Sequence, residues 1–156
     1  MAKRFTPTGT ITPERAHFNA TEKERLMKQT LLQEKYPVYV AEIDKAETSC
    51  QSVDEVVSYL KDKIAANPKV QFIGVFDHYA HTKRIEGEIN PEIKAAVDVI
   101  FCFGFALPNP QVLAVRPRSI GVADMGSKFV VSFMEAPMKP ANEAMEAWAK
   151  GLRNKG

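Results

Sequence analysis

The chain has 156 residues, of which 45% are hydrophobic and 26% are charged, and its formal net charge at pH 7 is +2. This length and composition are typical of one globular domain, and they argue against a disordered chain, a collagen-like repeat or a membrane protein. Basic residues gather near both ends of the chain without interleaved aromatic residues, so we predict no nucleic-acid partner. The longest apolar run, over residues 97–107, is too short to span a bilayer, so we predict no membrane partner.

The two cysteines, Cys50 and Cys102, lie far apart, and neither has a second Cys or His at the spacing of a metal finger. They are therefore expected to be free thiols. The start of the chain is basic but contains no apolar segment of the kind that a secretory signal needs. A reducing, cytoplasmic location is the prediction that follows.

The N-terminal part of the chain predicts an arm followed by a helix. Residues 1–20 carry several Pro, Gly and Thr residues, which favours an irregular arm, and residues 21–156 are expected to form a single compact α/β domain. Thr21 and Glu24 have the spacing of a capping box, in which the two side chains accept hydrogen bonds from free amides at a helix start. A helix over residues 22–34 is therefore predicted.

The next segments predict a strand, a helix and a second strand. The β-branched residues within 38–43 favour an edge strand. Ser52 and Glu55 form a second capping box, and the apolar residues after them recur on one helical face until about Asn67. Residues 70–76 are almost continuously apolar, which is typical of a strand in the middle of a sheet.

The C-terminal half predicts two short helices, three strands and a final helix. Asn90 precedes a proline and signals a helix start, and residues 99–105 form the most hydrophobic strand. Asn109 can cap the second short helix. Two strands within residues 119–134 are separated by a Gly-containing turn, which predicts a β-hairpin. Pro140 then opens a helix whose apolar residues share one face.

The predicted fold class is α+β, an α/β sandwich. Helices and strands alternate along most of the chain, which favours a mixed sheet of about five strands with helices on its faces. The late β-hairpin and the C-terminal helix complete this arrangement. No internal repeat is present in the sequence.

The apolar strand over residues 70–76 runs into Asp77, His78 and His81, whose ionisable groups form the first candidate site. Imidazole and carboxylate groups together can bind a transition metal or transfer protons near neutral pH. In a continued strand, His78 and His81 point to opposite faces. They can share a metal with Asp77 only if the strand stops by Tyr79 and the chain turns helically. A pair of histidines that are merely hydrogen-bonded at the strand end is the alternative.

A second group of candidates is basic. Arg116 and Arg118 flank a proline, and an extended backbone at this point aims both guanidinium groups the same way. Such planar groups bind carboxylate or phosphate through paired hydrogen bonds. If the strand ends meet, these residues form an anion pocket with His78; solvated arginines near acidic residues are the alternative. The predicted ligand-binding set is His78, Tyr79, Lys83, Arg84, Arg116 and Arg118.

Residues 52–137 resemble the bacterial family called domain of unknown function 302. The resemblance is carried by a capped helix start, an Asp-His strand end, an apolar strand ending in Phe-Gly, a Pro-containing loop before a short helix, and a closing β-hairpin. In this chain these features are Ser52 to Glu55, Asp77 to Ala80, Phe103-Gly104, Pro108 to Pro110, and the strands over residues 119–124 and 130–133. The resemblance implies a compact α/β fold and points to His78 as a candidate site residue. It implies no reaction.

Three functions are compatible with these residues. The leading prediction is a small soluble binding module for a small anionic ligand or a protein partner, with its site near His78, Arg116 and Arg118. The alternative is an enzyme with His78 as general acid or base, in which Asp77 orients His78 or shares a metal with His81. A transition metal is the one cofactor that the residues suggest. The third is a structural protein that forms a homodimer or another homo-oligomer through its N-terminal helix.

Overall fold

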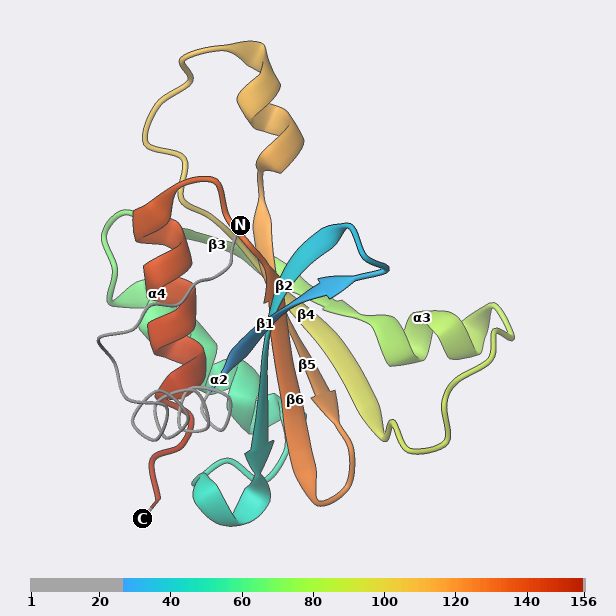
Figure 1. The fold of residues 1–156 in the computed structure, drawn as a ribbon. Helices are drawn as coiled ribbons and strands as arrows, with labels where there is room; N and C mark the ends of the chain where they lie inside the picture. Colours follow the sequence, from blue (N-terminus) through green and yellow to red (C-terminus); the bar gives the residue numbers. More distant parts are fainter. Residues whose placement is uncertain (1–26, 156) are drawn as a thin grey trace, which may run out of the picture.

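The structure is a computed structural model, and it describes residues 27–155 (Figure 1). The predicted arm over residues 1–20 and the capping box of Thr21 and Glu24 lie outside the described residues. Within the described range, no helix is long and apolar enough to cross a membrane. The elements in chain order are β1 (Lys28–Leu32), β2 (Tyr36–Asp44), η1 (Lys45–Glu47), α2 (Val53–Ala65), β3 (Gln71–Asp77), α3 (His78–Arg84), β4 (Ala95–Cys102), η2 (Pro110–Val115), β5 (Arg118–Asp124), β6 (Lys128–Met134) and α4 (Lys139–Lys150).

The strands form one six-stranded sheet in the order β1-β2-β6-β5-β4-β3. The α+β class is confirmed, but the sheet has one strand more than predicted, and all pairings between the described strands are antiparallel, not mixed. The helical crossover through α2 joins β2 to β3, which run in the same direction but are not neighbours. Because β4, β5 and β6 lie between them, the parallel pairing that a crossover usually makes does not occur.

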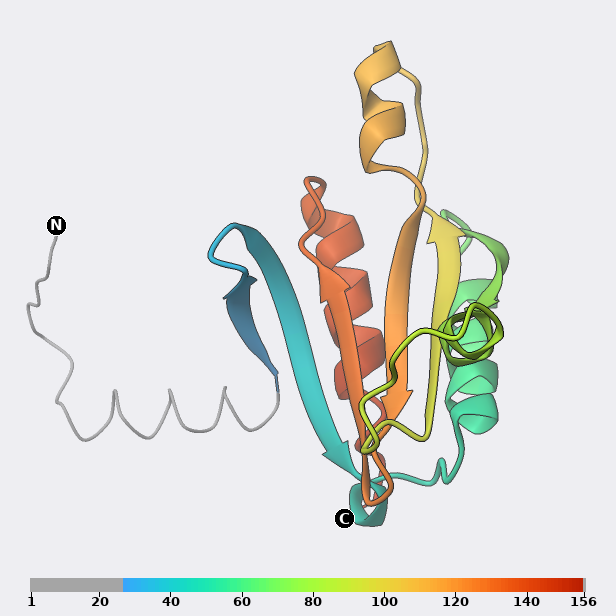
Figure 2. The same ribbon diagram turned by 90° about the vertical axis from the view of Figure 1, so that its right-hand side faces the viewer.

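The helices α2 and α4 lie on one side of the sheet, and α3 projects from the other side (Figure 1 and Figure 2). The core lies between the sheet and these two helices, and burying each large apolar side chain contributes about 1.5–3 kcal/mol. The helical spacings in the sequence predict the buried faces of both helices correctly. The core includes Val56, Leu60 and Ile64 of α2, Met145 and Trp148 of α4, and Val99, Phe101, Ile120 and Val131 of the strands.

Several predicted element starts are confirmed. The Ser52 hydroxyl caps α2 by accepting a hydrogen bond from the Glu55 amide at 3.2 Å. The Glu55 carboxylate accepts from the amide of Gln51 at 2.6 Å, one residue before the position that a capping box uses. Asn109 caps η2 by accepting from the Val112 amide at 3.2 Å. The β5–β6 hairpin and α4 also form where the sequence predicts them.

Residues 28–32 fall within the predicted helix over residues 22–34 but form strand β1. β1 pairs with β2 in antiparallel register, and the chain reverses through Gln33 and Glu34, whose φ angles are 53° and 62°. For residues 28–34 the helix prediction is wrong, because pairing with β2 overrides local preference, and residues 22–26 of the predicted helix lie outside the described range. β2 is consequently not an edge strand, and an oligomer held by an N-terminal helix loses this part of its basis.

The apolar run over residues 70–76 forms β3, but β3 lies at the edge of the sheet and not in its middle as predicted. A bulge at Ile73 shifts its register with β4, and Ile73, Val75 and Phe76 are 53%, 44% and 41% exposed. β4 lies further inside the sheet, with Phe101 fully buried. An apolar run predicts that a strand forms, but the position of that strand depends on which other strands pair beside it.

No helix forms after Asn90, where about two turns are predicted. The Asn90 side chain accepts a hydrogen bond from the Glu92 amide at 2.8 Å, and the backbone forms a turn. The amide of Lys94 already donates to Asp124 O at 2.7 Å, at the end of β5. Too few residues remain between the turn and this sheet contact for a helix to form.

Candidate functional site

His78 begins α3 at the point where β3 ends. Asp77 is the N-cap of this helix, and its carboxylate accepts a hydrogen bond from the Ala80 amide at 2.9 Å. The strand therefore stops before Tyr79, which is the condition for His78 and His81 to lie on one side of the chain. Asp77 is engaged by the helix cap, and the structure does not place it in contact with His78, so its predicted role in orienting His78 stays a prediction.

The partner of His78 is Asp98, from the middle of β4. His78 Nε2 lies 2.5 Å from Asp98 Oδ2, and the two side chains are 49% and 28% exposed. Asp98 faces away from α2 and α4, because strand residues alternate and the next residue, Val99, is in the core. Sequence reasoning missed Asp98 as a site residue. The signal was available, because Asp98 is the single charged residue in the apolar run over residues 95–105.

A shallow pocket of about 290 Å³, which we call the histidine pocket, lies beside this pair. Gly121 is opposite Asp98 in the β4–β5 register, and a Cβ atom there would lie 3.2 Å from Asp98 Oδ1 and 3.6 Å from Ser132 Oγ. The missing side chain leaves a carboxylate and a hydroxyl close together above the sheet. The other residues that line the pocket are Phe76, Ile100, Pro117, Arg118 and Ser119.

The three predicted metal ligands do not converge. Asp77 caps α3, and His81 Nδ1 accepts a hydrogen bond from Arg84 Nη2 at 2.9 Å. The Phe76 ring contacts both imidazoles, with its centroid 4.7 Å from that of His78 and 5.4 Å from that of His81. Within residues 27–155, no three His, Cys, Asp or Glu side chains are grouped so that they could hold a metal ion. The described geometry therefore does not form the predicted metal site.

The predicted basic group divides into two. Lys83 and Arg84 lie on α3, where Lys83 Nζ is 5.9 Å from the centroid of the Tyr79 ring. Neither these two residues nor Tyr79 line the pocket that contains Arg116 and Arg118. The predicted ligand-binding set is therefore not one site.

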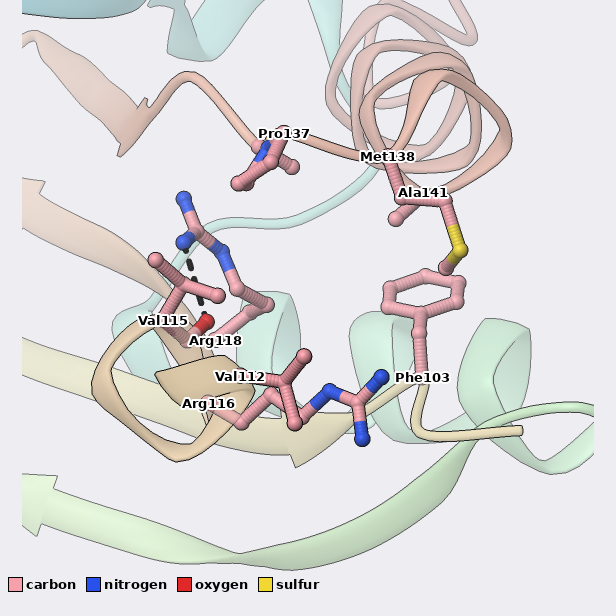
Figure 3. A pocket seen from close by; sticks show the side chains of 9 residues that line it. Phe103, Val112, Val115, Arg116, Arg118, Pro137, Met138 and Ala141 are labelled. Carbon is pink, nitrogen blue, oxygen red and sulfur yellow. Dashed lines mark hydrogen bonds between the residues drawn. The ribbon is translucent and has the colours of Figure 1, made fainter. Parts of the chain in front are cut away.

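Arg116 and Arg118 line a mostly apolar pocket of about 230 Å³, which we call the arginine pocket (Figure 3). One wall comes from η2 and from Arg116, which directly follows it. The opposite wall comes from the link between β6 and α4 and from the first turn of α4. The apolar side chains of the pocket are Phe103, Val112, Val115, Ala136, Pro137, Met138 and Ala141.

The guanidinium group of Arg118 is held by backbone carbonyls. Its Nη2 donates to Met134 O at 2.6 Å and to Glu135 O at 2.9 Å, and its Nη1 donates to Val115 O at 3.2 Å. Burial lowers the pKa of Arg118 from its usual value, but a guanidinium group remains protonated in proteins. Arg118 therefore fastens the end of η2 to the end of β6 and brings a partly buried positive charge to the pocket.

Arg116 uses fewer of its donors. Its Nη1 donates to Ala106 O at 2.8 Å, and no acceptor among the described residues meets Nε or Nη2. The guanidinium group passes over Gly104, where an added Cβ atom would lie 3.0 Å from Nη1. Within residues 27–155, no carboxylate lies within ion-pair distance of Arg116 or Arg118. Arg116 therefore presents unused N–H donors at an apolar cavity (Figure 3).

The start of α4 adds to the positive potential of the arginine pocket. Met138 is the N-cap of α4 and Ala141 lies in its first turn, where no side chain caps the helix. The amides of Ala141 and Asn142 donate to Met138 O, and Pro140 has no N–H group. A helix N-terminus carries a partial positive charge. Asn142 accepts a hydrogen bond from the Ala136 amide at 2.8 Å, which fixes the link that contains Pro137. The pocket thus combines apolar walls, two guanidinium groups and a helix N-terminus.

The single anion pocket predicted from His78, Arg116 and Arg118 does not form. His78 lines the histidine pocket, Arg116 lines the arginine pocket, and Arg118 borders both. Sequence reasoning also missed the apolar walls of the arginine pocket, such as Phe103 and Met138. Nothing local in the sequence distinguishes these side chains from ordinary core residues.

Comparison with known proteins identifies a family but no function. No curated protein matches the chain. The resemblance to domain of unknown function 302 stays a prediction, because the family model that matches is a different one. That model matches residues 27–154, which is most of the chain, so the chain belongs to the family of unknown function DUF6858.

Proposed function

We propose that this protein binds a small anionic ligand in the arginine pocket. The observation that carries the proposal is that Arg116 and Arg118 line an apolar cavity and have no carboxylate partner among the described residues. A partly buried charge without a counter-charge is unfavourable. An anion in the cavity supplies the opposite charge and accepts charge-assisted hydrogen bonds from Nε and Nη2 of Arg116.

A small ligand fits this site better than a protein partner does. The unused donors of Arg116 face a pocket of about 230 Å³ between η2 and α4, and not a flat surface that a second protein could cover. The partial positive charge at the N-terminus of α4 also favours an anion at this position. We therefore prefer the small-ligand version of the binding function.

Melting curves of the full chain in different sodium salts, at constant ionic strength, test this proposal. A ligand that binds only the folded state raises the melting temperature, so an anion that occupies the pocket stabilises the wild-type protein. Arg116→Gln is expected to lose this effect. Lys150→Gln is the matched control, because it removes the same charge at the far end of α4. An equal stabilisation of wild type and Arg116→Gln, or no stabilisation by any anion, rules the proposal out.

We also propose proton transfer by His78 as a second candidate function. The 2.5 Å contact between His78 Nε2 and Asp98 Oδ2 favours it, because a carboxylate that accepts from one ring nitrogen fixes the tautomer and leaves the other nitrogen to exchange a proton. Asp98 here takes the orienting role predicted for Asp77. Nitrogen-15 NMR of the imidazole rings tests this role: Asp98→Asn should change the tautomer of His78 and leave His81 unchanged. An unaltered His78 ring contradicts it.

We also propose a cytoplasmic location and a homo-oligomeric state for this protein. A cytoplasmic location is supported by the free state of Cys50 and Cys102, and cell fractionation tests it. Homo-oligomerisation is tested by sedimentation velocity of the full chain over a range of concentrations. A single monomeric species at every concentration contradicts the second of these.

A further inference from the structure

We infer that the ligand of the arginine pocket is a monocarboxylate with a small, wholly apolar body. This inference rests on the proposed function and adds the chemical class of the ligand. It follows from the donors that remain unused, from the chemistry of the walls and from the size of the cavity. The carboxylate contacts Arg116, and the body lies between η2 and the start of α4.

The unused donors favour a single carboxylate over a phosphate. Both Nη atoms of Arg118 already donate to carbonyls, which leaves its charge but only Nε and one N–H of Nη1 for a ligand. Arg116 has Nε and Nη2 available, and these two atoms form one planar fork that matches the two oxygens of a carboxylate. A phosphate dianion has further oxygens and a second negative charge, and apart from the two arginines the side chains of the pocket offer no donors to them.

The walls favour an apolar body. Besides the two arginines, the side chains that face the cavity are aliphatic, aromatic or thioether groups, among them Phe103, Val112 and Met138. A ligand hydroxyl or amide placed against these walls has no partner, and a buried polar group without a hydrogen bond is unfavourable. Apolar ligand atoms instead gain from leaving water. The pocket should therefore reject carboxylates whose bodies carry hydroxyl groups.

The size of the cavity limits the body. A volume of about 230 Å³ is the volume of roughly eight water molecules in the liquid, so the ligand has roughly eight to ten non-hydrogen atoms. Branched aliphatic acids of this size, such as 4-methylpentanoate, meet the requirement. For a ligand of this size we expect a Kd of about 0.1 to 1 mM.

The single tryptophan of the chain reports on this pocket. Trp148 is 7% exposed and stacks on Phe103, with ring centroids 5.8 Å apart and an interplanar angle of 17°. Phe103 in turn lines the cavity. A ligand that packs against Phe103 therefore changes the surroundings of the stacked pair, and the emission of Trp148 changes without any added label.

The experiment titrates the full chain with four transparent compounds and follows both Trp148 emission and melting temperature. They are 4-methylpentanoate, its neutral amide, acetate and inorganic phosphate. We expect saturable binding of 4-methylpentanoate and at least about tenfold weaker binding of the other three, since hydrogen bonds to a charged group and burial of the body each contribute. Arg116→Gln should weaken 4-methylpentanoate binding by roughly 10- to 100-fold.

A second variant separates loss of charge from loss of space. Val112→Phe keeps both arginines and fills the cavity, so it should abolish binding of 4-methylpentanoate while the protein still folds. Lys150→Gln is the charge-matched control and should bind like wild type. Binding by Val112→Phe that equals wild type overturns the placement of the apolar body.

The remaining outcomes distinguish this inference from the proposed function. If phosphate or acetate binds as tightly as 4-methylpentanoate and depends on Arg116, anion binding stands and the apolar monocarboxylate is wrong. If the neutral amide binds as tightly as the acid, the anionic ligand itself is wrong. If none of the compounds at concentrations up to about 20 mM alters emission or melting, both are wrong, because this exceeds the expected Kd more than tenfold.

Discussion

The hydroxyl group of Tyr59, on α2, donates a hydrogen bond to the backbone carbonyl of Trp148, on α4, at 2.8 Å. This contact joins the two helices that cover the sheet. It also lies next to Gly151, where an added Cβ atom would collide with the Tyr59 hydroxyl. This bond adds to the buried contacts that set the relative position of α2 and α4.

Tyr59→Phe should lower the free energy of unfolding by about 1 kcal/mol, since one hydrogen bond is lost and the ring remains. Burial raises the pKa of Tyr59 above its ordinary value, so the phenol of the unfolded chain loses its proton first as the pH rises. The contribution of Tyr59 is therefore complete below about pH 10 and declines as the pH rises toward the folded-state pKa. Urea unfolding between pH 8 and 11 should show a steeper alkaline loss in wild type than in Tyr59→Phe. Parallel losses contradict the prediction.

Glu42 should contribute to the loss of stability at acid pH. Lys128 Nζ lies 2.7 Å from Glu42 Oε1 across the β2–β6 pair, and this hydrogen bond lowers the pKa of Glu42 from its usual value. The contribution is present above about pH 4.5 and disappears as the pH falls through the lowered pKa. The side chains of Glu42 and Lys128 are 55% and 36% exposed, so water screens the pair and the effect is small. Wild type and Glu42→Gln should differ in melting temperature at pH 7 and converge near pH 3; a constant difference contradicts this.

Gly121→Ala should disturb the contact between His78 and Asp98, because the new methyl group lies close to the Asp98 carboxylate. The added methyl group lies 3.2 Å from Asp98 Oδ1, so the carboxylate must shift away from its position beside His78. The imidazole signals of His78 should move in a nitrogen-15 NMR spectrum, and those of His81 should stay. Unchanged His78 signals show that the carboxylate yields without altering the contact.

Gly104→Ala should move Arg116 without removing its charge. The added methyl group lies 3.0 Å from Nη1 of Arg116 and 3.3 Å from Sγ of Cys102, and the flexible arginine side chain can yield at small cost in stability. Binding of 4-methylpentanoate, measured by Trp148 emission, should weaken several-fold. Gly74→Ala is the control, because its methyl group meets no atom within 4 Å. Equal binding by both variants shows that the exact position of Arg116 is unimportant.

Asn142 should be needed for the link between β6 and α4. Asn142 is 8% exposed and accepts from the Ala136 amide, so Asn142→Ala leaves a buried N–H group without a partner. The free energy of unfolding should fall by about 1–3 kcal/mol in urea. Asn142→Asp keeps an acceptor and places a negative charge in the first turns of α4, so it should retain more stability. Equal losses in the two variants contradict the role of the side-chain acceptor.

Local signals in the sequence were sufficient for part of the fold. Ser52 and Asn109 cap their helices as predicted, because a cap involves residues three positions apart. The β5–β6 hairpin and the apolar face of α4 are equally local. The same reasoning picked out His78 at the end of β3, since an ionisable group after an apolar strand is visible without knowledge of the partners of that strand.

The tertiary structure decided the rest, because it depends on segments far apart in the chain. Residues 28–32 form a strand only because β2 pairs with them, and β3 is an edge strand because later strands occupy the middle of the sheet. His78 and Asp98 are also far apart along the chain, as are Arg116 and Met138, so local patterns do not reveal that they share a pocket. The sequence by itself determined which side chains could do chemistry. Only the packing of the sheet placed His78 beside the Asp98 carboxylate in one pocket. Only the packing of η2 and α4 placed the arginines at an apolar cavity in another.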